Sequence, residues 1–193
     1  GLVSWANLRR RRRLPKLEPG ELPRPGNQFA ALLIRDNFRH RADIEKAYLD
    51  AIARAQAEII IANAYFFPGR KFRQALVDAA RRKVHVVLLL QGRSDHPLLQ
   101  LASRALYRPL LEAGVRIHEY TAGFLHAKVA VCDGHWATVG SSNIDPFSLL
   151  LAREANVIVD DHAFAGELRD ALCVALETGA QPIAAAQWRS QSV

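Results

Sequence analysis

The sequence predicts an α/β domain, and three observations support this. The runs at 58 to 64 (EIIIANA) and 84 to 91 (VHVVLLLQ) are continuously apolar, as in strands buried on both faces of a sheet. Segments with helical periodicity alternate with these strands. After residue 124 the pattern changes to short strands joined by tight turns. We therefore expect a mixed, largely parallel sheet flanked by helices.

Each expected element has a local signal. The helix at 41 to 56 carries one apolar stripe that includes Ile44, Tyr48 and Ile52. Asp133 and Gly134 join two strands as a tight hairpin, because both positions tolerate positive φ. Asp160 or Asp161 caps the last helix, and Gly179 ends it. The expected strands are 29–36, 58–64, 84–91, 115–120, 125–133, 135–140 and 154–161, and the expected helices are 41–56, 70–83, 96–114 (one helix, or a pair broken near Pro109) and 163–179.

Composition limits the class of protein. The chain has 193 residues and a net charge of +7, which suits an anionic partner such as nucleic acid, an acidic lipid surface or a phosphorylated small molecule. We expect one domain at 29–180, a basic and proline-rich linker or arm at 1–28, and a tail at 181–193. The run Arg9–Arg13 could bind phosphates or form part of a solvated linker. Methionine is absent even at position 1, which predicts a piece of a longer protein.

Residues 125 to 143 (LHAKVAVCDGHWATVGSSN) combine an imidazole, an ammonium group, hydroxyls and a carboxamide. Side chains two residues apart on a strand share a face, so His126 and Lys128 are expected to point the same way. The hairpin returns the chain and brings Ser141 and Asn143 beside them. Lysine and amide donors suit phosphate oxygens, and histidine can act as a nucleophile or carry a proton. The set therefore predicts phosphoryl transfer, although an isolated His-x-Lys is more often an ordinary surface pair.

The full spacing is more specific than the pair. The pattern is His-x-Lys, four residues, Asp, six residues, then Gly-Ser-x-Asn, and it is matched by His126, Lys128, Asp133, Gly140, Ser141 and Asn143. This resembles the signature of the phospholipase D superfamily. Residues 38 to 178 further resemble the C-terminal half of bacterial cardiolipin synthases, most closely those of the B type. The resemblance implies a phospholipase D-like α-β-α sandwich and a membrane-associated phosphatidyltransferase that needs neither metal nor cofactor.

The resemblance also implies roles for individual residues. Two copies of the motif face one another in the superfamily; one histidine forms a phosphohistidine, and the other protonates the leaving alcohol. His126 would be the acid and base rather than the nucleophile, Lys128 and Asn143 would hold non-bridging phosphate oxygens, and Ser141 would donate its hydroxyl. Glu154 would orient a catalytic histidine, with an ordinary glutamate at a strand edge as the alternative.

The remaining motif residues have structural expectations, and two further segments are weaker candidates. Asp133, with Gly134 and Gly140, is expected to shape the turn rather than contact substrate. Tyr65 and Phe66 follow a buried strand and could line an acyl or glycerol path or belong to the core. Arg93 also follows a strand and could reach a lipid phosphate. No group of residues has familiar metal-ligand spacing.

The chain contains one copy of the motif, since no other histidine is followed by lysine two residues later. We therefore expect either a missing N-terminal half with the second motif or a homodimer partner. The implied substrate is an anionic phospholipid, phosphatidylglycerol, at the cytoplasmic face of the bacterial inner membrane, which the protein would bind peripherally. Two alternatives stay open: a single-motif homodimeric phosphodiesterase or nuclease, and a phosphate-binding module without turnover. Nucleic acid is the less expected partner.

Overall fold

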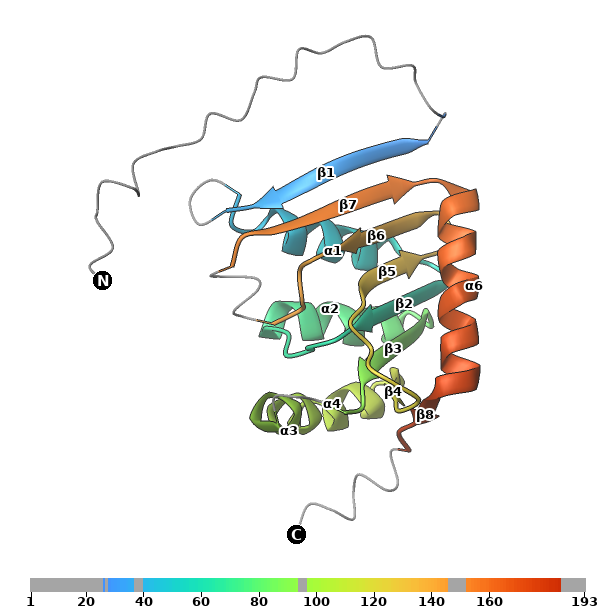
Figure 1. Ribbon diagram of the computed structural model, residues 1–193. Coiled ribbons are helices and arrows are strands. Elements are labelled where there is room, and N and C mark those ends of the chain that lie inside the picture. Colours follow the sequence, from blue (N-terminus) through green and yellow to red (C-terminus); the bar gives the residue numbers. More distant parts are fainter. Residues whose placement is uncertain (1–25, 27, 37–39, 94–96, 146–151, 185–193) are drawn as a thin grey trace, which may run out of the picture.

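The computed structural model describes residues 26, 28–36, 40–93, 97–145 and 152–184. In the helix that begins at Pro97, side chains are described only from residue 100 onward. Within these residues the chain forms an eight-stranded sheet with the strand order β1-β7-β6-β5-β2-β3-β4-β8. Figure 1 shows β1 at one edge of the sheet and α6 crossing the strands near one of their ends. The predicted arm at 1–28, with its run Arg9–Arg13, lies almost wholly outside the described residues.

The elements follow the expected order closely. The strands are β1 (Phe29–Arg35), β2 (Glu58–Asn63), β3 (His85–Gln91), β4 (Arg116–Tyr120), β5 (Lys128–Cys132), β6 (Trp136–Gly140), β7 (Glu154–Asp160) and β8 (Ala180–Pro182). The helices are α1 (Asp43–Arg54), α2 (Arg70–Arg81), α3 (Pro97–Ala105), α4 (Tyr107–Glu112) and α6 (His162–Gly179). Asp161 caps α6 by accepting a hydrogen bond from the Phe164 amide at 2.8 Å.

The sheet is mixed, as expected, but its parallel part is small. Only β2 with β3 and β3 with β4 pair in parallel, in the region where strands and helices alternate along the chain. The other five neighbouring pairs are antiparallel. The prediction of a largely parallel sheet is therefore wrong for the whole sheet, because the strands after residue 124 return through hairpins and add antiparallel pairs.

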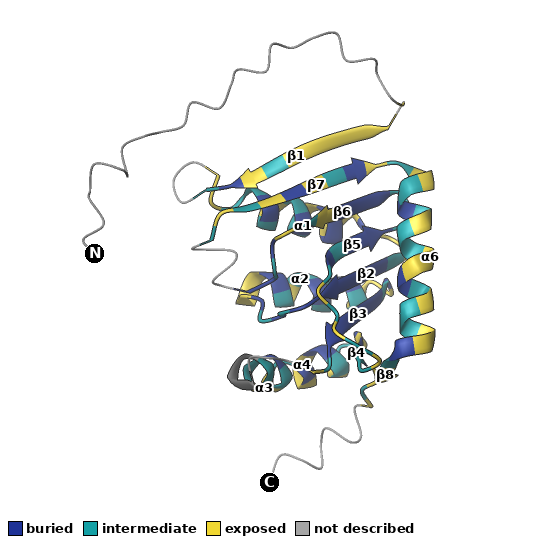
Figure 2. Cartoon of the chain, viewed as in Figure 1, coloured by how far each residue is buried: buried dark blue, intermediate teal, exposed yellow. Residues whose placement is uncertain are grey.

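Each face of the sheet has its own apolar core. One face packs against α1, α2 and α4, and its core includes Ile59, Ile61 and Leu88. The other packs against α6, and its core includes Ile60, Leu89 and Leu172. Because successive strand residues point to opposite faces, the unbroken apolar run of β2 supplies both cores. Figure 2 shows the central strands buried and β1 largely exposed.

Three local predictions need correction. The strand expected at 125–133 begins at Lys128, so His126 lies in the loop before β5. The helical segment at 96–114 is a pair whose break falls at Leu106, and Pro109 lies in the first turn of α4, where its missing N–H costs nothing. Regular structure continues past the predicted start of the tail at residue 181, because Gln181 and Pro182 of β8 pair with Glu119 and His118 of β4.

Candidate active site

The motif residues other than Asp133 gather at one end of the sheet, on the face that packs against α1 and α2. Ile61 of β2 and Ala130 of β5 belong to this face, so Asn63 and Lys128, two residues farther along, continue it. These two residues are directly opposite each other in the β2–β5 pair. At the outer strands Arg35 lies opposite Glu154 in the same way. The apolar face thus ends in a group of polar side chains, four of which are buried: Arg35, Asn63, Lys128 and Asn156.

Lys128 is almost fully buried, with 7% of its surface exposed. Burial lowers the pKa of its ammonium group, while the nearby carboxylates of Glu154 and Asp145 act in the opposite direction. Its Nζ donates to the main-chain oxygen of His126 at 3.2 Å. An ammonium group that has lost much of its water binds an anion more strongly than one in bulk solvent, so Lys128 is well suited to a phosphate oxygen.

His126 is exposed and lies two residues before β5. The main-chain contact with Lys128 ties its backbone to the buried ammonium group. The backbone of His126 is not part of the strand, so the expectation that the side chains of His126 and Lys128 point the same way stays a prediction. An exposed imidazole beside a buried cation can exchange protons with solvent and with a bound substrate.

Ser141, which follows β6, and Glu154, at the start of β7, are joined by a hydrogen bond. The Ser141 hydroxyl donates to the Glu154 carboxylate and accepts from the Ala155 amide at 3.1 Å. The Ser141 amide in turn donates to the Ala155 oxygen at 3.0 Å. Among the contacts of the described residues, the Glu154 carboxylate bonds to this hydroxyl and not to an imidazole. Its predicted role of orienting a histidine stays a prediction.

Gly140 and Asn156 form a close contact that holds the loop after β6. Asn156 is buried, donates from Nδ2 to Thr138 Oγ1 at 3.2 Å and accepts from the Ser142 amide at 3.4 Å. A Cβ on Gly140 would lie 2.2 Å from Asn156 Oδ1 and 2.5 Å from the Ala155 oxygen. The glycine of the motif is therefore required by close approach rather than by a turn conformation.

Two amide side chains, those of Asn63 on β2 and of Asn143 in the motif, have buried atoms near the end of β2. Asn63 accepts a hydrogen bond from the Ile144 amide at 3.2 Å, and this bond links the end of β2 to the motif. Its Nδ2 and the Oδ1 of Asn143 are buried and have no hydrogen-bond partner among the described residues. Asn143 thus has an unsatisfied buried amide oxygen and directly precedes the residue that bonds to Asn63.

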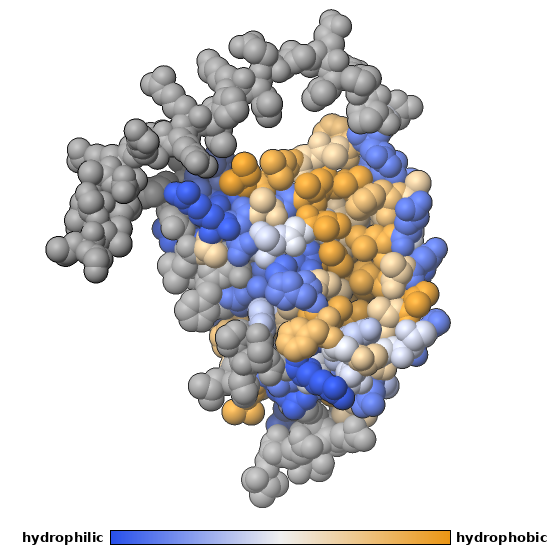
Figure 3. All heavy atoms as spheres, viewed as in Figure 1, coloured by the Kyte–Doolittle hydropathy of each residue, from blue (hydrophilic) through white to orange (hydrophobic). Residues whose placement is uncertain are grey.

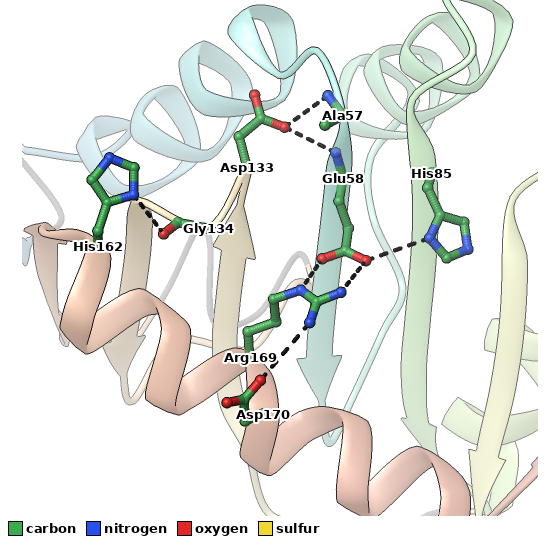
Figure 4. A network of polar contacts seen from close by, with 8 residues as sticks. All are labelled: Ala57, Glu58, His85, Asp133, Gly134, His162, Arg169 and Asp170. Atoms are coloured by element: carbon green, nitrogen blue, oxygen red, sulfur yellow. Dashed lines mark hydrogen bonds and ion pairs between the residues drawn. The ribbon is translucent and has the colours of Figure 1, made fainter.

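Asp133 lies at the far end of β5 from Lys128. Its carboxylate accepts three backbone N–H groups, from Gln56 at 2.8 Å, Ala57 at 2.8 Å and Glu58 at 2.9 Å. Burial acts to raise the pKa of Asp133, but these hydrogen bonds outweigh it and the pKa is lowered. Asp133 and Gly134 have φ values of 50° and 64°, as the hairpin prediction requires. Asp133 therefore fastens the hairpin to β2 (Figure 4).

The same region anchors α6 to the sheet. Figure 4 shows Arg169 of α6 reaching the Glu58 carboxylate, and Nη2 of its guanidinium group donates to that carboxylate at 3.1 Å. Glu58 also lies 3.5 Å from Nδ1 of His85. The start of β2 thus fixes both the hairpin and α6. The motif aspartate belongs to this structural network, away from the end of the sheet where Lys128 lies.

The weaker candidates separate in the structure. Phe66 is 2% exposed and belongs to the core on the α1 and α2 side, which favours its core interpretation. Tyr65 is half-buried and, together with Phe66, lines a small cavity that also contacts Gln91. Arg93 is exposed after β3. The segment that carries Tyr65 is joined to the motif by main-chain hydrogen bonds, from the Ala64 amide to the Ala127 oxygen at 2.9 Å and from the Phe67 amide to the Ile144 oxygen at 2.8 Å.

Sequence reasoning missed Arg35, Asn63 and Asn156. Arg35 is fully buried at the end of β1, where it donates to the main-chain oxygens of Ala152 and, at 3.3 Å, of Arg41. The missed residues share one signal, which is a polar side chain two residues before or after an apolar one on the same strand face. That signal also occurs at ordinary strand ends, so it becomes specific only when the strand order is known.

The described residues show neither a metal-binding cluster nor a membrane-spanning helix. Within the described ranges, no group of three or more histidine, cysteine, aspartate or glutamate side chains could hold a metal ion. No helix in the described part of the chain is long and apolar enough to cross a membrane.

Comparisons with known proteins agree with the motif. The family described as cardiolipin synthase, PLD-like domain, matches residues 48–172. Cardiolipin synthase B of Escherichia coli (strain K12) is 52% identical over 148 residues, which are 77% of this chain and 36% of the relative. The minor cardiolipin synthase of Bacillus subtilis is 37% identical over 125 residues, 65% of this chain and 31% of the relative.

Solved structures share the fold. The phospholipase D family member Nuc from Salmonella typhimurium has a TM-score of 0.69 at 20% identity, covering 81% of this chain and 99% of its own. Phosphatidylserine synthase of Haemophilus influenzae has a TM-score of 0.67 at 11% identity, covering 82% of this chain and 40% of its own. At these identities the likeness concerns the fold alone.

The match to the synthases covers most of this chain but a smaller part of the relatives, since the chain spans about a third of their length. The matched residues include the whole motif, from His126 to Asn143, and the strands that hold it. On its motif, its fold and its sequence, the chain belongs to the cardiolipin synthase family of phospholipase D-like domains.

Proposed function

We propose that this chain supplies one half of the active site of a phosphatidyltransferase that forms cardiolipin-type lipids. The observation that carries the proposal is the buried ammonium group of Lys128 beside the exposed His126, within a domain 52% identical to cardiolipin synthase B. The proposed donor of the phosphatidyl group is phosphatidylglycerol. The proposed acceptor is phosphatidylglycerol or a related glycerol-type alcohol. The proposed location is peripheral, on the cytoplasmic face of the bacterial inner membrane, where such lipids are available.

The proposed reaction has two steps. A histidine of the second motif attacks phosphorus, the bond between phosphorus and the leaving glycerol oxygen breaks, and His126 gives its proton to that oxygen. In the second step His126 takes a proton from the incoming alcohol, which attacks phosphorus and breaks the phosphorus–nitrogen bond. Lys128 and Asn143 hold the non-bridging oxygens throughout, where negative charge is greatest.

Ser141 and Glu154 have a supporting part in this proposal. Their hydrogen bond fixes the start of the motif loop against β7 and keeps the hydroxyl beside the phosphate position. Arg35 and Glu154 face each other across β1 and β7, so the carboxylate is held between a cation and the serine hydroxyl. The site is therefore preorganised before substrate binds.

The experiment uses a chimera in which this chain replaces the matching segment of Escherichia coli cardiolipin synthase B. Cardiolipin formation is measured in phosphatidylglycerol vesicles. His126→Ala is expected to abolish it, whereas His135→Ala, at the opposite end of β5, is the matched control and is expected to retain it. EDTA is expected to leave the rate unchanged.

Two outcomes would contradict the proposal. Full synthesis by the His126→Ala chimera would remove this histidine from the mechanism. Cleavage of plasmid DNA by the 193-residue chain alone, lost in His126→Ala, would favour the nuclease alternative.

A further inference from the structure

His126 is carried by a segment without regular structure, residues 121–127, which joins β4 to β5. Near its start the amides of Thr121 and Ala122 donate to the Gly179 oxygen, at the end of α6, at 2.8 and 3.2 Å. Figure 1 shows this segment passing in front of the sheet, and Figure 3 shows the hydrophobic area that the outer strands form above it, beside α6. Since the segment has no strand ladder of its own, the place of His126 depends on bonds from other elements.

Gln91 supplies a bond to the middle of this segment. It is the last residue of β3 and is 5% exposed. Its Oε1 accepts a hydrogen bond from the Leu125 amide at 2.8 Å, and Leu125 directly precedes His126. The Leu125 side chain packs against the core beneath α6. The residue before His126 is therefore held by both its main chain and its side chain.

The other end of the same side-chain amide holds a second loop. Nε2 of Gln91 donates to the main-chain oxygen of Arg93, whose side chain is exposed after β3. A buried glutamine needs partners for both its donor and its acceptor, and here each partner is the main chain of a different loop. An aliphatic residue would end this apolar strand without the cost of burying an amide, so the glutamine is an informative exception.

The turn that carries Gln91 is itself tightly held. The Gly92 amide donates to the Tyr120 oxygen at 2.9 Å, and a Cβ on Gly92 would lie 2.7 Å from that oxygen. Nε2 of Gln100, on α3, donates to the Gly92 oxygen at 2.7 Å. A side chain can fix the position of another group only when its own backbone is fixed, and Gln91 meets this condition.

We propose that Gln91 is a positioning residue for His126, which sets the place of this histidine relative to Arg93 by binding the main chain of both loops. The proposal rests on the proposed function, in which His126 transfers the proton. Gln91 contacts no reacting atom in that reaction. A displacement of about 1 Å at a catalytic group can lower a rate about 100-fold, so a bond that holds the residue next to His126 affects turnover.

The first test measures the hold on the segment without turnover. Gln91→Met keeps the size of the side chain and removes both hydrogen bonds, whereas Gln91→Glu keeps the acceptor for Leu125 and removes the donor to Arg93. In the 193-residue chain the Leu125 amide is expected to exchange with solvent at least about 10-fold faster in Gln91→Met and near the wild-type rate in Gln91→Glu. Gln100→Met is the matched control, since it removes a similar bond at the same turn, and it is expected to leave this exchange unchanged.

The second test separates positioning from a purely structural role. In the chimera with Escherichia coli cardiolipin synthase B, Gln91→Met is expected to lower kcat about 10- to 100-fold and to leave KM within about twofold. Gln91→Glu is expected to keep more of kcat than Gln91→Met, although its buried carboxylate makes it the less stable variant in urea. A residue that only stabilises the fold would give the same order of variants in kcat and in stability.

The outcomes separate this inference from the proposed function. Opposite orders in kcat and stability support it. Unchanged Leu125 exchange in Gln91→Met overturns it, and so does a kcat that follows stability. If the wild-type chimera makes no cardiolipin, the proposed function fails, whereas the exchange measurement still decides whether Gln91 holds the segment.

Discussion

Gly140 is the most constrained position of the motif, and Gly140→Ala is expected to destabilise the domain strongly. The new Cβ would lie 2.2 Å from Asn156 Oδ1, 2.3 Å from its Cγ and 2.5 Å from the Ala155 oxygen. Asn156 is buried and hydrogen bonded on both sides, and the Ala155 oxygen is main chain, so neither can move cheaply. Overpacking of this kind costs about 3 kcal/mol.

The measurement is the free energy of unfolding from urea titration, together with the thermal midpoint. For a domain of this size a loss of about 3 kcal/mol lowers the midpoint by about 6 to 12 °C. Gly166→Ala is the matched control. Gly166 lies within α6, and a Cβ there meets nothing within 4 Å. Alanine in place of this helical glycine is expected to raise the free energy of unfolding by about 0.5 to 1 kcal/mol.

The contact with Asn156 can be isolated by a double mutant. Asn156→Ala alone removes the acceptor of the Ser142 amide and is expected to destabilise the domain. Combined with Gly140→Ala it also removes the closest clash, so the double mutant is expected to lose less unfolding free energy than the sum of the two single-mutant losses. Strictly additive losses, or a Gly140→Ala protein as stable as the wild type, would refute the close-packing explanation.

Two further predictions concern the network at the start of β2. Asp133→Asn is expected to cost about 2 to 4 kcal/mol near neutral pH, because three backbone N–H groups lose a charged acceptor. Because the pKa of Asp133 is lowered in the folded protein, its contribution to stability is present above the ordinary aspartate pKa and is lost as the pH falls through the folded-state pKa. Urea titrations at several pH values should therefore show that the difference in unfolding free energy between wild type and variant shrinks in acid. A difference that stays constant down to acid pH would argue against this. Arg169→Met is expected to cost about 1 kcal/mol and to speed amide exchange in α6, whereas Asp170→Asn, which removes an exposed carboxylate, should leave exchange unchanged.

Most of the fold could be predicted because its signals are local. The continuous apolar runs of β2 and β3, the stripe of α1 and the Asp133-Gly134 turn each depend on a few neighbouring residues. The direction of strand pairing depends on which strands meet, and that is a property of the whole chain. β8 was missed for the same reason, since a three-residue strand with Pro182 has little signal until β4 lies beside it.

The site was predictable to the extent that spacing carries chemistry. The motif named His126, Lys128 and Asn143, and the structure brings their segments to one end of the sheet. It did not name Arg35 or Asn63, because these residues come from strands far away in sequence and join the site only through register. The contact of Glu154 with Ser141 likewise depends on β6 and β7 being neighbours.

Strand alternation separates two surfaces of β1, β6 and β7. On these strands one residue points into the polar candidate site and the next points to the aliphatic face, as in Ile34 with Arg35 and Val139 with Gly140. A one-residue slip of any of these strands would exchange the two surfaces, placing a buried cation on the aliphatic face and an aliphatic group in the candidate site. The close contact between Gly140 and Asn156 holds this register at β6 and β7. The geometry of the candidate site therefore depends on the same strand pairing as the aliphatic face behind it.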